Sequence, residues 1–305
     1  MKTPVAFFIF RRPDTTEKVF EAIRQVKPPK LLVVADGPRT DRPGEAEKCA
    51  AARALIERVD WECEVLKNYS DINLGAKQRG ASAISWVFEQ VEEAIILEDD
   101  CIPHPTFFRF CEELLDYYRD DKRIMAIAGD NSRRMGQRRT EDSYYFSRLT
   151  PIWGWATWRR AWQYYDVTMK LWPMVKEGYW LRDILRSERA TKAWSDTFES
   201  IYEDKIDAWD YQWTFACWLQ SGINVVSNLN LISNCGFNVE ATHTIDPDYF
   251  RANAPLEAMN FPLQHPPFMI CDTQIEELAW NQDYPDLPSR IQTKVKKILK
   301  TKTKL

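Results

Sequence analysis

Three consecutive acidic residues, Glu98, Asp99 and Asp100, are the most informative chemical feature of the sequence. They follow an apolar run at residues 94–97, which is typical of a strand covered on both faces of a parallel sheet. Adjacent carboxylates repel one another, and a bound divalent cation would relieve that repulsion. Hard oxygen ligands at a strand end suit Mg²⁺ or Mn²⁺, which commonly carry substrate phosphates. An acidic turn in solvent is the alternative interpretation.

Further polar residues follow other predicted strands or begin the helix after one. Arg12 follows the first predicted strand and Asp36 ends the second. Lys77 and Arg79 stand in the first turns of a helix predicted over residues 76–90. Ligands of open α/β sheets bind at the carboxyl ends of the strands, so we expect these side chains to share one site.

The chemistry of these residue types suits a nucleotide. Carboxylates accept hydrogen bonds from ribose hydroxyls or from the N–H groups of a base, and arginines hold phosphates through two parallel bonds. Each residue alone has a simpler explanation as part of a turn or a solvated surface. Their occurrence at successive strand ends is what predicts a nucleotide-binding site.

A second group of candidates lies in the later half of the chain. Asp210 stands at the start of a helix predicted over residues 210–220, where the helix dipole favours the ionised carboxylate. It is therefore either the N-cap of that helix or a base that stays deprotonated at neutral pH, with Asp207 as its nearest competitor. His243 lies in a predicted loop and is a candidate ligand of a metal or a phosphate.

Tryptophan is unusually abundant, with thirteen residues in the chain. The spacing within residues 153–162 favours packing between two lobes, although aromatic faces also stack on sugar rings. We take Trp155 and Trp209, together with Glu98, as candidates for contacting a donor sugar or an acceptor. Four arginines form either a phosphate-facing lid or a solvated loop, namely Arg133, Arg134, Arg138 and Arg139.

The elements that position these residues alternate between strand and helix patterns in the first half of the chain. Strands are predicted at residues 4–10, 30–36, 63–66, 94–97 and 123–128, with a helix between each pair. Alternating units of this length imply right-handed crossovers. We therefore predict an α/β fold with an open, mainly parallel sheet and helices on both faces.

After Gly129 the pattern changes to an arginine-rich loop, Trp-rich helices and a proline-rich, irregular stretch. We predict a nucleotide-binding half over residues 1–150 and an acceptor-binding half that carries the catalytic base over residues 151–288. Both belong to a single body. Residues 289–305 form a basic tail.

Charge is unevenly distributed along the chain. The net charge is −4, but the tail has seven basic residues and no acid, so the other 288 residues carry −4 − 7 = −11. An acidic body argues against nucleic-acid binding. Apolar residues at helical spacing among the lysines of residues 289–305 predict peripheral membrane contact, with a disordered terminus as the alternative.

The cysteines and the missing motifs narrow the class further. Seven scattered cysteines lack zinc-site spacing, which predicts reduced thiols and a cytoplasmic protein. The sequence has no cleavable signal and no run of eighteen apolar residues. The absence of GxGxxG, GxxxxGK[ST] and GxSxG disfavours dinucleotide-binding, kinase-like and hydrolase functions.

Taken in order, these motifs resemble the nucleotide-sugar-binding half of GT-A glycosyltransferases, including bacterial family 2-like enzymes. The similarity is closer to the GlcNAc transferases that begin N-glycan branching. Those enzymes also have Glu-Asp-Asp at a strand end followed by a proline and paired aromatics, as in residues 98–108 here. A Gly-Trp segment like residues 151–155, a Trp-Asp pair like Trp209-Asp210 and a late histidine like His243 follow.

The resemblance implies a GT-A fold and an inverting transfer of sugar from a nucleotide-diphosphate donor, a UDP-sugar. It implies that Asp100 binds Mn²⁺ or Mg²⁺ holding the donor diphosphate, and that Asp99 contacts the ribose. Asp36 and Arg12 would help to bind the base. Asp210 would deprotonate an acceptor hydroxyl on a glycan, a lipid-linked sugar or a protein. A bacterial enzyme that builds a lipid-linked or surface glycan at the inner membrane face fits this chain.

Two alternative functions stay open from the sequence. A sugar-1-phosphate nucleotidyltransferase would use a related fold, but it usually has a Gly-rich, basic signature near the first strand, which residues 8–13 lack. A carbohydrate- or membrane-binding module with a degenerate site would keep the fold without turnover.

Overall fold

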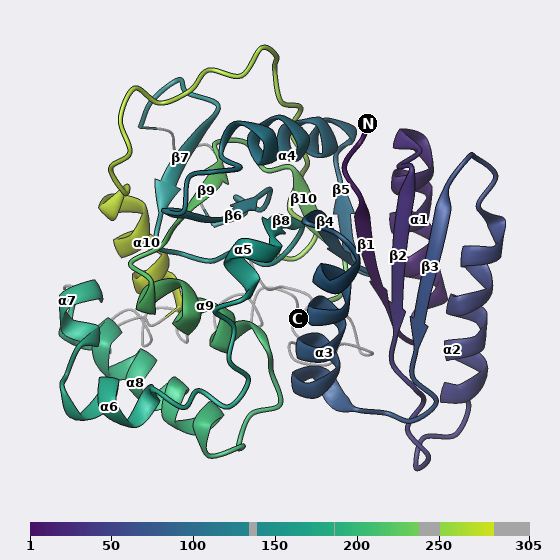
Figure 1. The fold of residues 1–305 in the computed structure, drawn as a ribbon, viewed down its shortest axis with the longest axis horizontal. Helices are drawn as coiled ribbons and strands as arrows, with labels where there is room; N and C mark the ends of the chain where they lie inside the picture. The colour runs from purple at the N-terminus through teal and green to yellow at the C-terminus, as the bar shows by residue number, and fades with distance from the viewer. Residues whose placement is uncertain (134–138, 186, 238–250, 284–305) are drawn as a thin grey trace, which may run out of the picture.

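The computed structural model describes residues 1–133, 139–185, 187–237 and 251–283. An eight-stranded sheet in the order β3-β2-β1-β4-β8-β6-β9-β7 runs through the molecule (Figure 1). Its strands are β1 (Val5–Ile9), β2 (Lys30–Ala35), β3 (Glu64–Tyr69), β4 (Glu93–Glu98), β6 (Ile124–Ala128), β7 (Tyr144–Ser147), β8 (Trp155–Trp158) and β9 (Ile223–Ser227). Two short strands, β5 (Cys101–Pro103) and β10 (Ile232–Asn234), form a separate antiparallel pair.

Six of the eight strands run in one direction, and only β7 and β8 run against them. Alternate residues of β1 face opposite sides of the sheet, as the strand period requires. Phe7 packs in the core that contains Phe20 of α1, whereas Ala6 packs in the core that contains Ile84 of α3. The predicted fold class, an open and mainly parallel sheet with helices on both faces, is confirmed.

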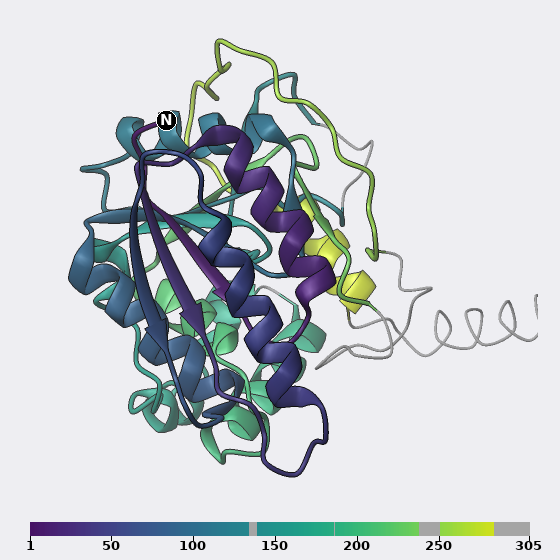
Figure 2. The same cartoon turned by 90° about the vertical axis from the view of Figure 1, so that its right-hand side faces the viewer.

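Helices cover both faces of the sheet, and further helices from the later half of the chain pack together beside it (Figure 1). Figure 2 shows α1 and α2 side by side along one face. The helices are α1 (Pro13–Val26), α2 (Glu45–Ala54), the 3₁₀ turn η1 (Leu55–Arg58), α3 (Gly75–Gln90), α4 (Pro105–Tyr117), α5 (Arg159–Trp162), α6 (Trp172–Glu177), α7 (Leu181–Leu185), α8 (Glu188–Tyr202), α9 (Asp210–Leu219) and α10 (Thr273–Asp283).

The strand β8 was not expected from the sequence, whose tryptophan spacing favoured packing between two lobes at this position. All four of its residues are buried, and Ala156 pairs with Ile95 of β4 on one side and Ile127 of β6 on the other. A strand from beyond residue 150 therefore completes the sheet of the first half. The predicted division at residue 150 separates the two expected binding functions, but the sheet continues across it.

The helices α6 to α10 pack through a core of aromatic rings. Trp172, Phe198 and Phe215 are almost fully buried, and the rings of Trp218 and Trp280 extend the cluster toward α10. Large rings bury much apolar area at little conformational cost, which explains why short helices such as α6 and α7 are held in place. The abundance of tryptophan in this half is thus largely a matter of packing.

Several sequence predictions fall on residues that the structure does not describe. They are His243, Arg134, Arg138 and the basic tail 289–305. Within the described ranges, no helix is both long and apolar enough to cross a bilayer. All seven cysteines are free thiols, as the sequence predicted.

Candidate active site

A cavity of about 210 Å³ opens at the carboxyl ends of β1, β2 and β4, and we call it the strand-end cavity. It brings together six of the predicted site residues: Arg12, Asp36, Arg79, Glu98, Asp99 and Trp209. Ten further residues, both apolar and polar, complete the lining, namely Phe8, Ile9, Phe10, Val34, Arg39, Asn73, Gly75, Ala76, Gly80 and Asp207. The polar residues that end successive strands therefore do share one site.

Arg12 neutralises part of the acidic triplet. Its guanidinium pairs with Asp99 and, at 2.9 Å, with Oδ2 of Asp100, while Asp99 also accepts a bond from the N–H of Phe10 at 3.1 Å. Burial works against the charged guanidinium, yet the two carboxylates raise the pKa of Arg12 above its ordinary value. This corrects the sequence argument, in which only a bound cation relieved the repulsion. Arg12 and Asp99 are paired with each other, and their predicted contacts with base and ribose stay predictions.

Arg12 pairs with Asp99 and Asp100, and the carboxyl group of Glu98 experiences the repulsion that remains within the triplet. Burial, and then the charges of Asp100 and Asp99, raise the pKa of Glu98 to about 8, and the charge of Asp210 adds to the effect. Burial likewise raises the pKa of Asp99 to about 6 against the opposing charge of Arg12. A dication beside Glu98 would favour its ionised form, so the electrostatics of this corner suit a cation.

The donor set beside Asp100 fits a hard divalent metal ion. A carboxylate oxygen of Glu98, one of Asp100 and the thiol of Cys101 lie within 4.8 Å of one another. Burial raises the pKa of Cys101 well above its ordinary value, and the thiol donates to Oδ1 of Asp100 at 3.3 Å. Because the sulfur stays protonated and Mg²⁺ and Mn²⁺ prefer oxygen, Glu98 and Asp100 are the ligands that fit. The sequence named Asp100 for this role and gave Glu98 to the sugar.

Asp36 holds the cavity wall through both oxygens of its carboxylate. Its Oδ1 accepts from the N–H groups of Gly37 at 2.9 Å and Leu74 at 3.0 Å. Its Oδ2 accepts from Nδ2 of Asn73 at 3.0 Å and from the N–H of Gly75 at 3.2 Å. Two carboxylate oxygens offer about four acceptor positions, and all are used. Asp36 therefore joins β2 to the start of α3, and its contact with a base stays a prediction.

The start of α3 is held by an acid from far along the chain. Asp207 accepts from the N–H groups of Ala76 at 2.9 Å and Lys77 at 2.8 Å, which are free donors of the first helical turn. The ammonium of Lys77 pairs with Asp204, and this side chain does not line the strand-end cavity. Lys77 thus serves to attach α3 to the segment after α8.

Arg79 is the cation that suits an anionic ligand. It is buried in the lining of the strand-end cavity, and Nη2 donates to the backbone and to Oδ1 of Asn68, the latter at 3.0 Å. Among the described residues no carboxylate pairs with it, and burial lowers its pKa. Arg12 and Arg39 of the same lining are paired with acids. Within the described lining, Arg79 is therefore the cation without a carboxylate partner.

The two tryptophans proposed for sugar contact have different positions. Trp209 lines the strand-end cavity and lies close against α3, because Gly80 presents no side chain to it. Trp155 stacks on Trp209, with ring centroids 5.9 Å apart at 22°, and its own side chain is fully buried. Trp155 is a packing residue behind Trp209, so its assignment to the sugar is not supported by its position.

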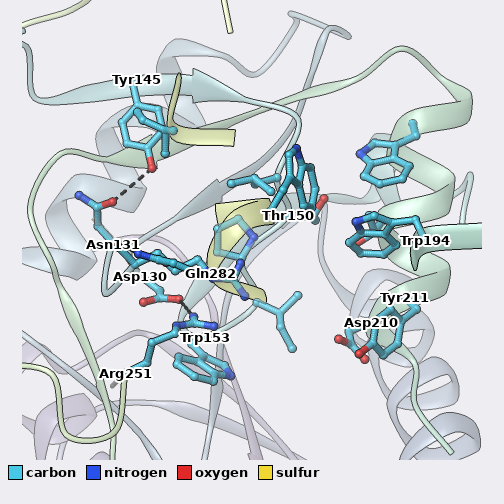
Figure 3. A pocket seen from close by; sticks show the side chains of 18 residues that line it. Asp130, Asn131, Tyr145, Thr150, Trp153, Trp194, Asp210, Tyr211, Arg251 and Gln282 are labelled. Atoms are coloured by element: carbon cyan, nitrogen blue, oxygen red, sulfur yellow. Dashed lines mark hydrogen bonds and ion pairs between the residues drawn. The ribbon is translucent and has the colours of Figure 1, made fainter. Parts of the chain in front are cut away.

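A second cavity, of about 470 Å³, lies on the other side of the start of α9, and we call it the aromatic cavity (Figure 3). Asp210 lines it, whereas its neighbour Trp209 lines the strand-end cavity. Asp210 is the first residue of α9 and Trp209 occupies the N-cap position without a side-chain bond, so the predicted N-cap role of Asp210 is wrong. The first turn of α9 separates the two cavities.

One wall of the aromatic cavity was not predicted from the sequence. Arg251 pairs with Asp130, donates to Oγ of Ser132 at 2.9 Å and lies over the ring of Trp153 at 3.8 Å. Asp130 follows β6 by two residues, so the rule that located the other strand-end residues would have found it. Arg251 is far away in the sequence and carried no local signal. Of the predicted arginine lid, only Arg133 lines this cavity among the described residues.

Comparisons with known proteins identify only distant similarities. The sequence matches no protein-family profile and no curated protein. Among solved structures, it is similar to mouse xyloside xylosyltransferase 1 (10% identity, 87% of this chain and 100% of that one, TM-score 0.35). It is also similar to a Thermus thermophilus mannose-1-phosphate geranyltransferase (14%, 74% and 74%, 0.34). A third is 4-diphosphocytidyl-2C-methyl-D-erythritol synthase from Anaerococcus prevotii (13%, 61% and 78%, 0.32).

Proposed function

We propose that this protein is a metal-dependent, inverting glycosyltransferase that moves a sugar from a UDP-sugar to an acceptor hydroxyl. The observation that carries the proposal is the arrangement around the first turn of α9. A cavity lined by Glu98, one of the two proposed metal ligands, and by Arg79 lies on one side, and a larger cavity with the carboxylate of Asp210 lies on the other. Asp100, the second proposed ligand, adjoins Glu98 just outside the cavity lining. Asp210 is near enough to raise the pKa of Glu98, so the two sets of charges are neighbours.

The strand-end cavity provides for the donor. Arg79 pairs with a phosphate, and Arg12 keeps the carboxylates of Asp99 and Asp100 in position. Glu98 and Asp100 would hold Mg²⁺ or Mn²⁺, which when bound neutralises charge on the diphosphate leaving group. Trp209 lines this cavity and directly precedes Asp210 in the chain, so the donor sugar would lie beside its ring.

The aromatic cavity provides for the acceptor. Asp210 removes the proton of the acceptor hydroxyl, and the hydroxyl oxygen forms a bond to the anomeric carbon of the donor sugar. The bond from that carbon to the phosphate oxygen breaks on the opposite face, and its electron pair leaves with the nucleoside diphosphate. Attack opposite the leaving group inverts the anomeric configuration. Peripheral membrane contact through residues 289–305 stays a prediction.

A thermal-shift screen of nucleotides and nucleotide sugars, with and without Mn²⁺, tests the donor half of this proposal. We expect UDP or a UDP-sugar to raise the melting temperature only when metal is present. Indifference to every nucleotide would contradict the proposal. Product analysis separates the enzyme alternatives, since glycosyl transfer releases UDP whereas a nucleotidyltransferase consumes UTP and a sugar phosphate and releases pyrophosphate.

A further inference from the structure

The aromatic cavity combines ring faces with balanced charge. Among the residues that the structure describes, four charged side chains line it, two acids (Asp130 and Asp210) and two arginines (Arg133 and Arg251). Its volume of about 470 Å³ falls in the range of roughly 300–1,000 Å³ that small-ligand sites occupy. A described lining without excess positive charge offers nothing extra to a phosphate, and a cavity of this size favours a small molecular unit over a length of polypeptide.

One wall of this cavity contains a hydrogen-bond donor that lacks an acceptor. Trp194 of α8 lies against Trp218 at 4.8 Å and Tyr211 at 5.9 Å between ring centroids, and Figure 3 shows its ring facing the cavity. Its indole Nε1 is buried and has no partner among the residues described. A buried N–H without an acceptor is unfavourable, so a ligand oxygen at this position would be favoured.

The opposite wall offers both an apolar face and polar groups. The ring of Trp153 supports Arg251, which Asp130 holds in place. Oδ1 of Asn131 accepts from the hydroxyl of Tyr145 at 3.2 Å, which leaves the amide nitrogen of Asn131 without a bond to that ring. A pyranose has this same duality, with C–H patches on its faces and hydroxyls around its rim, so it suits both walls.

From these contacts we propose that the aromatic cavity binds an uncharged saccharide unit as the acceptor, and that the indole N–H of Trp194 donates to one of its oxygens. This inference rests on the proposed function and selects a saccharide among the possible acceptors. Asp210, on the same cavity, faces the hydroxyl that reacts. Trp194 acts by positioning the saccharide and takes no part in proton transfer.

Saturation-transfer NMR on the full chain with UDP and Mn²⁺ tests binding without turnover. The probes are the methyl glycosides of glucose, galactose, mannose and N-acetylglucosamine. Undecaprenyl phosphate in detergent and a serine- and threonine-rich peptide serve as comparators. We expect at least one methyl glycoside to bind, and the comparators to compete with it weakly or not at all. Binding of a comparator with no methyl glycoside bound would overturn the inference.

Paired variants test the role of Trp194. Trp194→Phe keeps the ring and removes the N–H, and it should weaken saccharide binding about three- to tenfold, as the loss of one neutral hydrogen bond does. Trp172→Phe removes an N–H from the same aromatic core, where it donates to Glu199 at 2.7 Å away from the cavity, and binding should not change. Equal affinities for Trp194→Phe and the unaltered protein would remove Trp194 from the site, and melting temperatures report whether both variants fold.

These outcomes separate the inference from the function on which it rests. If UDP binds with metal but no saccharide binds, the saccharide acceptor is wrong and the donor half of the proposal stands. If a saccharide binds but no nucleotide does, the cavity is a saccharide site and the transferase proposal fails.

Discussion

The two cavities differ in how they are built. The strand-end cavity is the smaller of the two, and several of its charged groups are held by one another or by backbone N–H groups, as Arg12 is by Asp99. The aromatic cavity is about twice as large, and tryptophans from four separate segments form much of its lining. Fixed charges suit a diphosphate whose charge is the same in every donor. Ring faces suit an acceptor that is recognised by its shape.

The two cavities meet at the first turn of α9. Trp209 and Asp210 are adjacent in the chain, yet each lines a different cavity. The carboxylate that we assign to the acceptor is therefore placed by the same helical turn that walls the donor site. Variants on either side should separate effects on the chemical step, on donor binding and on stability.

The largest effect is expected from Asp210→Asn. Removing a general base typically costs about 10²–10⁴-fold in rate, so kcat should fall by that amount while UDP affinity is unchanged. Release of UDP under saturating donor, with titration calorimetry for UDP, measures both quantities. The matched control is Asp196→Asn, which alters an exposed carboxylate of α8 outside both cavities. A normal kcat in Asp210→Asn would show that another group takes the proton.

Asp100→Asn should act on the donor side alone. The amide is a poor metal ligand, so the melting-temperature increase caused by UDP with Mn²⁺ should disappear and turnover should drop about 10²–10³-fold. Saccharide binding in the aromatic cavity should persist. Asp116→Asn, at an exposed site on α4, provides the control. Retention of the metal-dependent shift would place the cation elsewhere.

Asp36→Asn should reduce stability by about 1–3 kcal/mol, because the new NH₂ group would face N–H donors that now bond to a carboxylate oxygen. Urea unfolding followed by circular dichroism measures this loss. Asp71→Asn changes an exposed acid in the next strand-end loop and should leave the midpoint in place. An unchanged midpoint in Asp36→Asn would mean that the loops do not depend on these bonds.

The smallest effect is expected from Gly80→Ala. A Cβ at this position would overlap the ring of Trp209, which Trp155 and Trp162 confine from other sides. Overpacking costs about 1–3 kcal/mol, and the gain in helix propensity returns about 1, so we expect a net loss near 1 kcal/mol. UDP-sugar affinity should fall with it, whereas Ser82→Ala on the exposed side of α3 should change neither. Greater stability in Gly80→Ala would show that Trp209 can move freely.

Local patterns in the sequence were enough to predict the strand-end cavity. Residues such as Arg12 and Glu98 directly follow apolar runs, and parallel strands bring such ends to one edge. The pairing of Arg12 with Asp99 depends on β1 lying beside β4, which no local pattern encodes. The same is true of Asp36, whose role is fixed by a loop that lies 37 to 39 positions later in the chain.

The aromatic cavity could not be predicted, because its parts are separated by long stretches of chain. Asp130 and Arg251 pair across 121 positions. The strand β8 escaped detection because its residues are buried on both faces and show no alternation. The tryptophans were noticed, but composition does not distinguish Trp155, inside the core, from Trp194, beside the cavity.

The position of β8 has a consequence for how this protein is made. A nascent chain that has emerged only to residue 150 has β4 as an open edge, with apolar residues on both faces and backbone groups that seek a partner. Such edges template aggregation. The first half can therefore complete its sheet only after the segment 155–158 has left the ribosome. A protein cut at residue 150 should precipitate rather than yield a separate nucleotide-binding half.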